Sequence, residues 1–582
     1  MILQALVRYY ETLLEKDKIA PLNYAKAGVS FGLRLREDGS LADILPLNIV
    51  EQRGDKTIER PKSLNMPESV VRASGILSNF LWDNAMYLLG LDTKGDPART
   101  LRCFACAKEL HQSILSGVEG KTAESIRAFF TSWQPESAAT HPVVKLHLDD
   151  LLGTGNLVFL GMDTMYAFED PAICAAWERH RAENQNSYRA QCLVSGKADQ
   201  AIATTHPKVK CVSGGQSSGT SLVSFNAQSY WSYGQEYSLN APISEYAAFA
   251  YTSALNYLIA DFDHRFMLDG DTVVCWAENG GTKYQDAFLF GIDPHVKTDT
   301  EVSGIFQRIV SGEPIDIDGY EPDTPFYVLC LSPNAARVSV RFFLSDTFGQ
   351  LTKHLAEHYR RLEIAMSPTE PPYLHLKELL RTTVPVFSKD EAISPLLSGA
   401  TLRSILSGTC YPVALYENIL IRIRADRIIN RARAATIKAY LLKNDSKTEH
   451  KEVLTVALNE QSNNKSYVLG RLFSLLEQSQ ESANPGINAT ITDSYFDSAC
   501  ATPRLTFPTL LKLNRHHLAK DDKWGWRYER QIGELVDKLN VDDDPYPARL
   551  TLDEQGLFIL GYYHENQVRY AKKESNLEKE KK

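Results

Sequence analysis

Apolar residues recur at helical spacing at the start of the chain and in several later segments. In the opening segment these residues are Leu3, Leu6, Tyr10, Leu13 and Leu14. A period near 3.6 residues places such positions on one face of an amphipathic helix. The same pattern predicts helices over residues 69–90, 99–116 and 122–133.

Alternating apolar and polar residues predict strands in the first 350 residues. Residues 31–36 alternate in this way, and the Glu37-Asp38-Gly39 turn that follows predicts a hairpin. Further along, short runs predict strands: LVFLGM, VKCV, SLVSF, TVVCWA, FYVLCLS and ARVSVRFFL. They alternate with helical patterns such as residues 244–262, without the regular rhythm of a doubly wound sheet, which predicts a mixed α/β region.

Beyond a break at Pro368, Pro371 and Pro372, the pattern becomes mainly helical. Helices are predicted over residues 400–443, 466–480, 503–520 and 524–539, and a short strand pair over residues 549–552 and 557–562. The fold class is therefore α+β, with a mixed α/β N-terminal region (1–370) followed by a C-terminal helical bundle (371–572). Residues 573–582 are rich in Lys and Glu and are predicted to form a disordered tail.

The composition narrows the class of protein. With 582 residues, 43% of them apolar and 23% charged, the chain is a folded protein of several domains. It has no apolar run long enough to cross a membrane, and its N-terminus lacks the apolar core of a signal peptide, so we expect a cytoplasmic location. Nine cysteines without regular spacing fit free thiols. A net charge of −9 argues against coating nucleic acid with the whole surface, but it allows a local basic groove.

One such local region is the window of residues 206–235. No acidic residue lies between Asp199 and Glu236, whereas the window holds Lys208, Lys210, several hydroxyls and four aromatic residues. Glycine backbone and hydroxyl groups donate hydrogen bonds to phosphate oxygens, and aromatic rings stack on bases. The window is therefore predicted to contact a nucleic-acid backbone.

Residues 211–221 (CVSGGQSSGTS) resemble two catalytic motifs and fit neither. In the phosphate-loop pattern, Thr220 stands where the lysine that reaches the β and γ phosphates belongs. The pattern G-x-S-x-G places Ser217 as a nucleophile, yet that motif must lead from a strand into a helix, and a strand is predicted to follow. A serine hydrolase using Ser217 and a flexible hairpin loop without a partner remain the alternatives.

A second basic element spans residues 422–443. Its seven basic residues, Arg422, Arg424, Arg427, Arg431, Arg433, Lys438 and Lys443, face a single acidic one, Asp426. On one continuous helix Arg424, Arg427 and Arg431 share a face with Lys438, which suits a track of phosphates. A solvated helix face is the alternative interpretation.

Other candidates for chemistry are weak. Cys103 and Cys106 form a single C-x-x-C without a second pair, so buried thiols are expected. His516 and His517 lack a carboxylate at metal spacing. The cluster of Asp261, Asp263, His264, Asp269 and Asp271 lies at a predicted helix end and turn, where Asp is common. We therefore predict no enzyme active site, no cofactor and no metal site.

Several long segments resemble a known family, the large subunit of the type I-C CRISPR surveillance complex (Cascade). They are residues 206–226 (HPKVKCVSGGQSSGTSLVSFN), 232–258, 323–343 (DTPFYVLCLSPNAARVSVRFF), 422–441 (RIRADRIINRARAATIKAYL), 488–513 and 557–565. The resemblance runs nearly end to end. It implies a non-enzymatic subunit that recognises the protospacer-adjacent motif (PAM) in duplex DNA, promotes R-loop opening, holds displaced strand and helps recruit a helicase-nuclease.

The resemblance also implies the partners. These are the guide-RNA-containing Cascade subunits (the backbone and handle-binding subunits and a small subunit), target double-stranded DNA and the helicase-nuclease. It further implies that the C-terminal helical part, roughly residues 455–572, is also made separately from an internal start. The sequence has no Met after Met366, so that start would use another codon.

The residues that contact nucleic acid are predicted from composition. They are Lys208, Lys210, Ser213, Gly214, Gly215, Gln216 and Asn226 in the window, with Arg424, Arg427 and Arg431 in the basic element. Asn79, Trp82 and Asn84 are weaker candidates. A glycine loop with amide side chains fits a minor groove, where readout depends on few acceptors. Besides the hydrolase, a purely structural assembly subunit is the rival function.

Overall fold

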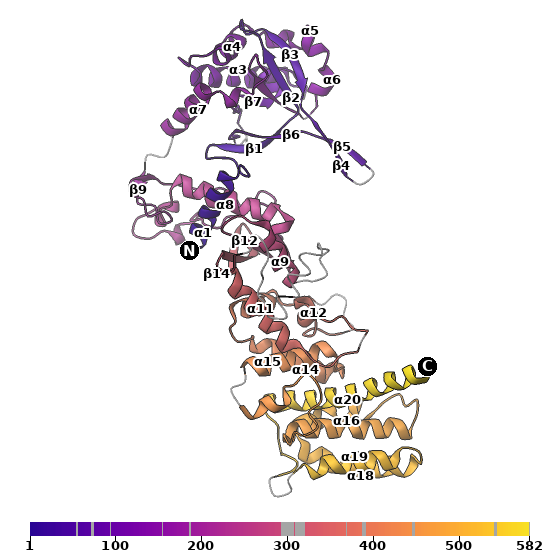
Figure 1. Ribbon diagram of the computed structural model, residues 1–582. Coiled ribbons are helices and arrows are strands. Elements are labelled where there is room, and N and C mark those ends of the chain that lie inside the picture. Colours follow the sequence, from indigo (N-terminus) through magenta and orange to yellow (C-terminus); the bar gives the residue numbers. More distant parts are fainter. Residues whose placement is uncertain are drawn as a thin grey trace. The chain divides into compact units, whose positions relative to one another are not determined.

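The computed structural model describes residues 1–53, 56–70, 75–92, 95–153, 155–184, 188–292, 308, 321–367, 369–386, 392–444, 448–539 and 544–580. The chain divides into two compact units (Figure 1). Unit 1 comprises residues 1–208 and 223–257, and unit 2 comprises residues 209–222 and 258–582. The boundary predicted at residue 370 falls inside unit 2, so the functional domains drawn from the sequence stay a prediction.

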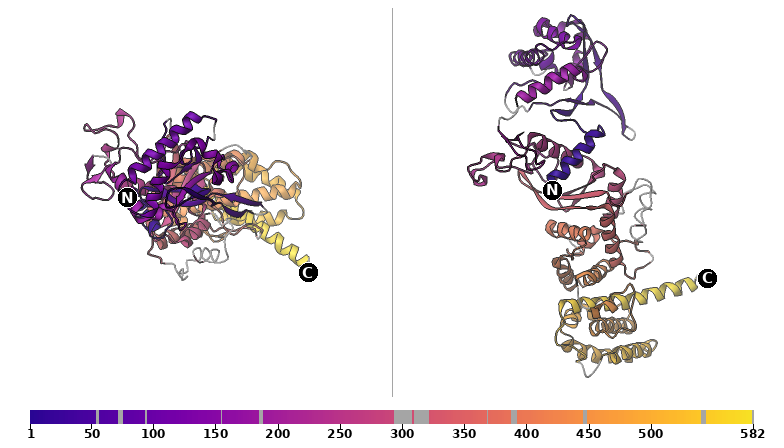
Figure 2. Two further views of the ribbon diagram at one scale, coloured as in Figure 1. Left: turned by 90° about the horizontal axis from the view of Figure 1, so that it is seen from above. Right: turned by 60° about the vertical axis from the view of Figure 1, so that its left-hand side comes forward.

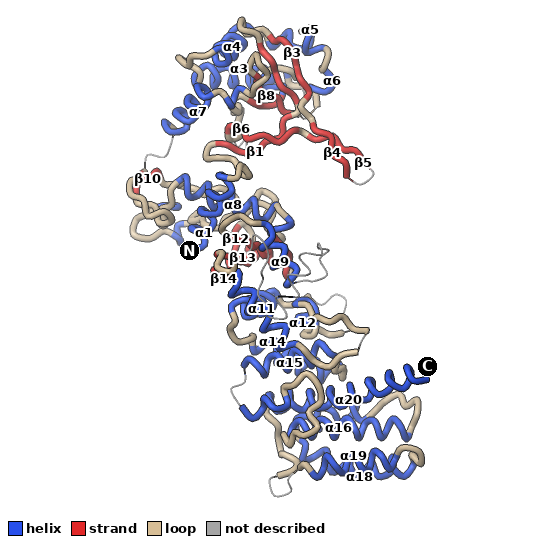
Figure 3. The backbone as a smooth tube through the Cα atoms, in the orientation of Figure 1, coloured by secondary structure: helices blue, strands red, loops and turns tan. Residues whose placement is uncertain are grey.

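Strands lie in the N-terminal part of the chain, and helices dominate its C-terminal part. In the described part of the chain every strand ends at or before Thr347, and the segments after it are helices and loops (Figure 3). This distribution confirms the α+β class.

In unit 1, α1 (Ile2–Glu15) confirms the first predicted helix. Its buried face consists of Ala5, Leu6, Tyr9, Tyr10 and Leu13. The Tyr10 ring meets the rings of Tyr246 and Phe249 edge-on, with centroids 6.1 and 5.8 Å apart. Both rings belong to α8 (Glu245–Ala260), another predicted helix. Aromatic packing thus joins the two sequence ends of unit 1.

A four-stranded sheet forms the centre of the first part of unit 1. Its strands lie in the order β3 (Leu41–Pro46), β2 (Phe31–Leu35), β8 (Asn156–Leu160) and β7 (Trp82–Asn84). β2 and β3 form the predicted hairpin, and β8 runs parallel to β2. The core of this sheet is shared with α3 (Pro97–Ile114), α4 (Lys121–Ser132) and α7 (Pro171–Glu183).

Shorter elements complete unit 1. They are the pair β1 (Tyr24–Val29) with β6 (Lys62–Pro67), the hairpin β4 (Ile49–Arg53) with β5 (Lys56–Arg60), the pair β9 (Arg189–Ala190) with β10 (Gln200–Ala201), and the helices α5 (Pro142–Lys145) and α6 (Leu148–Leu151).

The helix predicted over residues 69–90 is wrong. The described part of this segment contains β7 and the short helix α2 (Ala85–Leu88) but no long helix. Polar side chains replace helical hydrogen bonds: the Val70 amide donates to Asn79 Oδ1 and the Asn79 amide to Asp83 Oδ2, each at 3.0 Å. Leu81 adopts φ +67°, which a right-handed helix excludes. The spacing of apolar residues carries no signal for these side-chain hydrogen bonds, which compete with the backbone hydrogen bonds of a helix.

Unit 2 contains an antiparallel sheet with neighbouring helices. The strands lie in the order β11 (Arg265–Leu268), β12 (Asp271–Ala277), β13 (Pro325–Asn334) and β14 (Arg337–Thr347), and the last three confirm predicted strands. A continuous core joins this sheet to α9 (Thr282–Ile292), α11 (Phe348–Leu362) and α13 (Pro395–Ser407).

The predicted strands VKCV and SLVSF are wrong, since residues 209–225 form isolated bridges only.

The rest of unit 2 is helical. Its helices are α12 (Leu376–Arg381), α14 (Val413–Asp426), α15 (Arg431–Asn444), α16 (Lys465–Ala483), α17 (Ile491–Ala501), α18 (Pro503–Lys520), α19 (Gly525–Asp537) and α20 (Leu552–Glu580). The predicted helix over residues 400–443 is three helices, because Gly408 and Arg427 adopt left-handed φ values of +69° and +57° and end α13 and α14.

The strand pair predicted near the C-terminus is also wrong, because residues 552–562 belong to α20. Leu557, Phe558, Ile559 and Leu560 are all buried. A helix surrounded by other helices is apolar on every side, and a short apolar run does not distinguish it from a buried strand. α20 continues to Glu580, within the segment predicted to be disordered, as expected for residues with high helix propensity.

Helices α16 and α20 lie side by side at backbone contact (Figure 2). A Cβ added at Gly470 would lie 1.9 Å from the Phe558 carbonyl oxygen, and one added at Gly561 would lie 2.1 Å from that of Tyr467. Beside this contact the Arg471 guanidinium donates to buried Glu565 at 2.9 Å. Gly470 and Gly561 therefore let the backbones of α16 and α20 approach more closely than any residue with a Cβ would allow.

We expect Gly561→Ala to destabilise unit 2 by overpacking, by about 1–3 kcal/mol or more. Gly533→Ala in α19 is the matched control, because a Cβ there meets nothing within 4 Å. It should stabilise the helix by up to about 1 kcal/mol. Thermal unfolding followed by circular dichroism measures both changes, and an unchanged melting temperature for Gly561→Ala would contradict this packing.

Candidate nucleic-acid interface

The window of residues 206–235 begins on a fixed anchor in unit 1. His206 is buried, and its Nδ1 lies 2.7 Å from the Tyr251 hydroxyl on α8. Burial lowers the pKa of His206 to about 4, so this imidazole is neutral near pH 7 and adds no positive charge. The Asn256 side chain donates to the Lys208 carbonyl at 3.1 Å, while Lys208 itself is exposed.

Residues 209–222 form a loop, here called the glycine loop, that belongs to unit 2. At its base the backbones of Val209 and Thr220 exchange two hydrogen bonds of 2.7 and 2.8 Å. Ser221 then pairs with β14: its amide donates to the Ala336 carbonyl, and its carbonyl accepts from the Val338 amide, both at 3.0 Å. Thr220 and Ser221 are buried. The loop is thus a folded extension of the sheet's edge.

The tip of the glycine loop is built from two tight turns. The Gly215 amide donates to the Val212 carbonyl at 3.0 Å, and the Gly219 amide to that of Gln216 at 2.9 Å. Gly214 and Gly219 adopt φ values of +69° and +94°, which favour glycine. A Cβ added at Gly215 would lie 2.8 Å from Thr220 Cγ2. These contacts fix the tip, so it presents its polar groups in one arrangement.

The glycine loop brings together five of the predicted contact residues. Lys210, Gly214 and Gln216 are exposed, and Ser213 and Gly215 are half-buried. The Ser213 amide donates to Thr272 Oγ1 on β12 at 3.2 Å, which adds a further tie to the sheet. The exposed tip also carries the hydroxyls of Ser217 and Ser218. Its polar groups are therefore hydrogen-bond donors and the Gln216 amide, and it contains no carboxylate.

Lys208 and Asn226 belong to unit 1 instead, with the aromatic part of the window. Trp231 Nε1 donates to the Phe225 carbonyl at 3.2 Å and folds this segment back on itself. Tyr233 is fully exposed, and Tyr230 is 45% exposed. Exposed rings of this kind are available for stacking.

Neither catalytic motif takes its required form in the glycine loop. Ser217 lies in a turn, and residues 218–227 contain no helix that a nucleophile elbow or a phosphate loop would lead into. The first helical turn afterwards is the 3-10 segment Gln228–Tyr230.

The basic element differs from its prediction. It is interrupted: α14 ends at Asp426 and α15 begins at Arg431. The common face predicted for Arg424, Arg427, Arg431 and Lys438 on one helix is therefore wrong.

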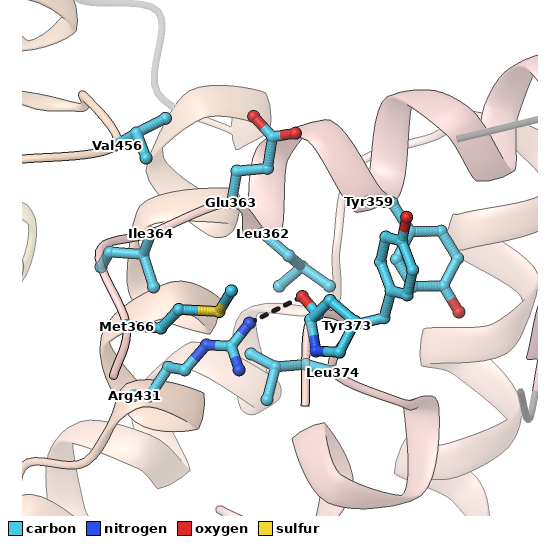
Figure 4. A pocket seen from close by; sticks show the side chains of 10 residues that line it. Tyr359, Leu362, Glu363, Ile364, Met366, Tyr373, Leu374, Arg431 and Val456 are labelled. Atoms are coloured by element: carbon cyan, nitrogen blue, oxygen red, sulfur yellow. Dashed lines mark hydrogen bonds between the residues drawn. The ribbon is translucent and has the colours of Figure 1, made fainter. Parts of the chain in front are cut away.

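The three predicted arginines make contacts within unit 2. Arg424 donates to Gln555 and Arg427 to Asp497. Arg431 is buried and donates to the Pro372 carbonyl at 2.8 Å. Figure 4 shows Arg431 beside Met366 and Leu374 in a pocket of about 270 Å³. That these arginines contact phosphate stays a prediction, but their contacts favour a structural role.

The neighbouring basic groups are also internal. Arg433 is fully buried and forms an ion pair with Asp426. Lys438 Nζ donates to the carbonyls of Arg361 and Glu363 at 3.0 and 2.6 Å, and burial lowers the pKa of Lys438 to about 8. Lys438 thus satisfies carbonyls at the end of α11 and joins it to α15, whereas Arg433 donates to the Ile428 carbonyl between α14 and α15.

The weaker candidates also have structural roles. Asn79 accepts a backbone bond as described above, Trp82 Nε1 donates to the Pro67 carbonyl at 2.8 Å, and Asn84 caps α2.

Cys103 is buried in α3. Asp271 is buried against Arg341 at 3.2 Å. Among the described residues no cluster of metal-ligating side chains occurs, and no helix is long and apolar enough to span a membrane.

One basic surface was not predicted. Helix α18 carries four Lys or Arg residues and two His residues and contains no Asp or Glu, and the exposed Trp524 and Trp526 follow it directly. The acid-free stretch from residue 498 to 520 was its sequence signal.

We expect Arg431→Ala to lower the stability of unit 2 by about 1–3 kcal/mol, because it removes the buried Arg431 guanidinium and its hydrogen bonds to the Pro371 and Pro372 carbonyls. Folded protein should keep its affinity for DNA and the salt dependence of that affinity. Thermal unfolding and a salt titration of binding measure the two effects. Weaker binding with a flatter salt dependence and an unchanged melting temperature would instead support phosphate contact.

Comparison with known proteins gives one family. The family model described as "CRISPR-associated protein (Cas_Csd1)" matches residues 6–570. No curated protein matches the chain. Since the match covers nearly the whole length, including both units and the glycine loop, the chain belongs to the CRISPR-associated Cas_Csd1 family.

Proposed function

We propose that this chain is a nucleic-acid-binding subunit of an RNA-guided type I-C Cascade complex, and that it recognises the PAM in duplex DNA without catalysing a reaction. The observation that carries the proposal is the rigid, acid-free glycine loop within a chain that matches the CRISPR-associated family from residue 6 to residue 570. In such a complex the guide RNA supplies most of the sequence information, so the protein needs to read only a short duplex.

The glycine loop suits contact with a DNA groove. Its glycines lack side chains that would keep the backbone away from the sugar–phosphate walls. The exposed Gln216 amide offers both donor and acceptor groups to base edges, and Lys210 adds a positive charge for a phosphate. Because the tip is fixed by internal hydrogen bonds and by β14, little conformational entropy is lost on binding.

The second part of the window supports duplex opening. Lys208 and Asn226 are exposed polar residues of the same acid-free window, and Tyr230 and Tyr233 are exposed aromatic residues. Unstacking a base step costs a few kcal/mol, and stacking on aromatic side chains offsets part of this cost. We therefore place R-loop opening and retention of displaced strand among the functions of this subunit.

The proposed role requires further partners. These are the guide-RNA-containing backbone and handle-binding subunits, a small subunit and the helicase-nuclease. We place the small-subunit-like part, roughly residues 455–572, in the helical part of unit 2, with α16 and α20 at its centre.

The rival functions make different predictions. A serine hydrolase requires Ser217 to be activated, but the turn around Ser217 lacks the elbow geometry. Labelling by a fluorophosphonate probe that Ser217→Ala abolishes would establish that activity and overturn the proposal. A purely structural subunit would assemble normally and show no binding defect in any glycine-loop variant.

We expect Gln216→Ala to weaken binding of the assembled complex to PAM-containing duplex by roughly 5- to 150-fold, the effect of about 1–3 kcal/mol from one base contact. A target whose PAM region is already unpaired should bind with unchanged affinity. Electrophoretic mobility shifts on the two targets measure this difference. Equal loss on both targets would contradict motif recognition by this residue.

Lys210→Ala should weaken duplex binding for every motif sequence alike and lower the salt slope by about 1, because it removes one phosphate contact. The matched control is Lys353→Ala on α11, which removes an equally exposed lysine from the same unit. Equal effects of both variants would show that net charge, and not the glycine loop, governs binding.

A further inference from the structure

A buried cation lines the pocket of unit 2. Arg431 is 7% exposed, and its guanidinium lies among the side chains around this cavity of about 270 Å³ (Figure 4). Its two terminal nitrogens donate to the carbonyls of Pro371 and Pro372. Its Nε atom is buried and has no hydrogen-bond partner among the described residues. A guanidinium offers five N–H donors, so the two carbonyls leave most of them unused.

The charge of Arg431 is not compensated as that of neighbouring buried cations is. Arg433 forms an ion pair with Asp426. Lys438 contacts backbone carbonyls, and burial lowers its pKa to about 8, so it can lose its proton. Arg431 cannot, because a guanidinium stays protonated in proteins. In the part of the chain that the structure describes, Arg431 contacts carbonyls but no carboxylate, although a buried charge is costly unless it is paired.

The acidic residues of the neighbouring segment do not supply the missing charge. Glu363 lines the pocket but is exposed to water. The carboxylate of Glu370 accepts a hydrogen bond from the Ser367 amide at 3.0 Å. A water molecule at Nε would satisfy this donor but would leave the positive charge uncompensated. The site therefore favours an anionic ligand.

The rest of the pocket is mainly apolar. Its walls include Leu362, Ile364, Met366, Leu374 and Val456. Three of these are buried, whereas Met366 is 41% exposed and Val456 is 47% exposed. Ligand pockets commonly combine apolar walls with a few polar groups that fix the orientation of the ligand. An anion that also carries an apolar group would contact both parts of this pocket.

We infer that this cavity, called the Arg431 pocket below, binds a carboxylate attached to a small apolar group. A planar carboxylate matches the fork of a guanidinium. A phosphate would bring about two negative charges to a site with one buried cation and the exposed Glu363. A cavity of roughly 150 Å³ holds benzene, so 270 Å³ accommodates an aromatic ring with its carboxylate.

The inference goes beyond the proposed function and does not depend on it. The residues that line the pocket all belong to unit 2, and none lies in the window of residues 206–235. Two sources provide the same chemistry: a free acid, and the C-terminal carboxylate of a chain that ends in an apolar residue. The experiment separates them and uses no nucleic acid, so its failure leaves the test of Gln216→Ala unaffected.

The experiment is isothermal titration calorimetry of the purified full chain with phenylacetate, a free acid, and with N-acetylphenylalanine, which mimics a chain terminus. Phenylacetamide has the shape of phenylacetate without its charge. We expect it to bind roughly 10- to 150-fold more weakly, the effect of losing hydrogen bonds between charged groups. Tighter binding of phenylacetate identifies a free acid as the ligand and tighter binding of N-acetylphenylalanine a chain terminus, and both support the site. Equal binding of phenylacetate and phenylacetamide, or no binding of either acid, would overturn the inference.

Met366→Trp should block the pocket and weaken phenylacetate binding at least 10-fold, because the larger side chain extends from the exposed edge of the cavity. The matched control is Met165→Trp in unit 1, since Met165 is 40% exposed and does not line the pocket. Both variants should keep the parent melting temperature, because they change exposed side chains. An equal loss of binding in the two variants would contradict the site.

Arg431→Gln tests the role of the cation directly. This variant keeps the apolar walls and loses the charge, so its folded form should bind phenylacetate and phenylacetamide equally. Phenylacetate should also raise the melting temperature of the parent chain, because a ligand that binds only the folded state stabilises it. It should not raise that of Arg431→Gln. A variant that still prefers the acid over the amide would overturn the assignment of Arg431 as the anion-binding group.

Discussion

Two backbone hydrogen bonds attach the glycine loop to the sheet of unit 2: the Ser221 amide donates to the carbonyl of Ala336, just before β14, and the Val338 amide of β14 donates to the Ser221 carbonyl. With the Val209–Thr220 pair they close the loop at its base, and the Ser213 amide ties its first half to β12. These bonds fix the backbone that carries the polar groups of the tip. A glycine-rich segment is therefore held by hydrogen bonds here, which reduces the conformational entropy lost on binding a groove.

The chain uses basic residues in two opposite ways. Between residues 422 and 443 the cations point inward, where Arg433 pairs with Asp426 and Lys438 satisfies carbonyls from α11. On α18 the cations point outward beside exposed indoles. A buried cation must be paired, so it serves folding. On α18, Arg504 pairs with the exposed Asp544, whereas Lys512 and Arg515 are exposed cations. Both segments are rich in basic residues, with Asp426 as the one acidic residue of 422–443 and none in α18, and burial separates their roles.

This contrast explains what the sequence could and could not predict. Segments such as α1, α8 and α16 and the strands β12 to β14 were predicted from their apolar patterns; α1 buries one face in a core, whereas β12 and α16 are buried almost throughout. The segment around Asn79 and the run from Leu557 to Leu560 were not, because side-chain hydrogen bonds in the first and burial on every side in the second override periodicity. The break at Arg427 has no glycine or proline to announce it.

The candidate site was predicted in part for the same reason. The absence of acidic residues and the glycines of residues 206–235 are visible in the sequence and led to the exposed loop. Whether an arginine faces solvent depends on distant partners such as Asp497 and Gln555, which no local pattern contains. The most direct test is site-specific photocrosslinking of a PAM duplex to the assembled complex, with the crosslinks mapped to residues. The account predicts crosslinks at Lys210 and Gln216 in the glycine loop, and crosslinks confined to other parts of the chain or to other subunits would contradict it.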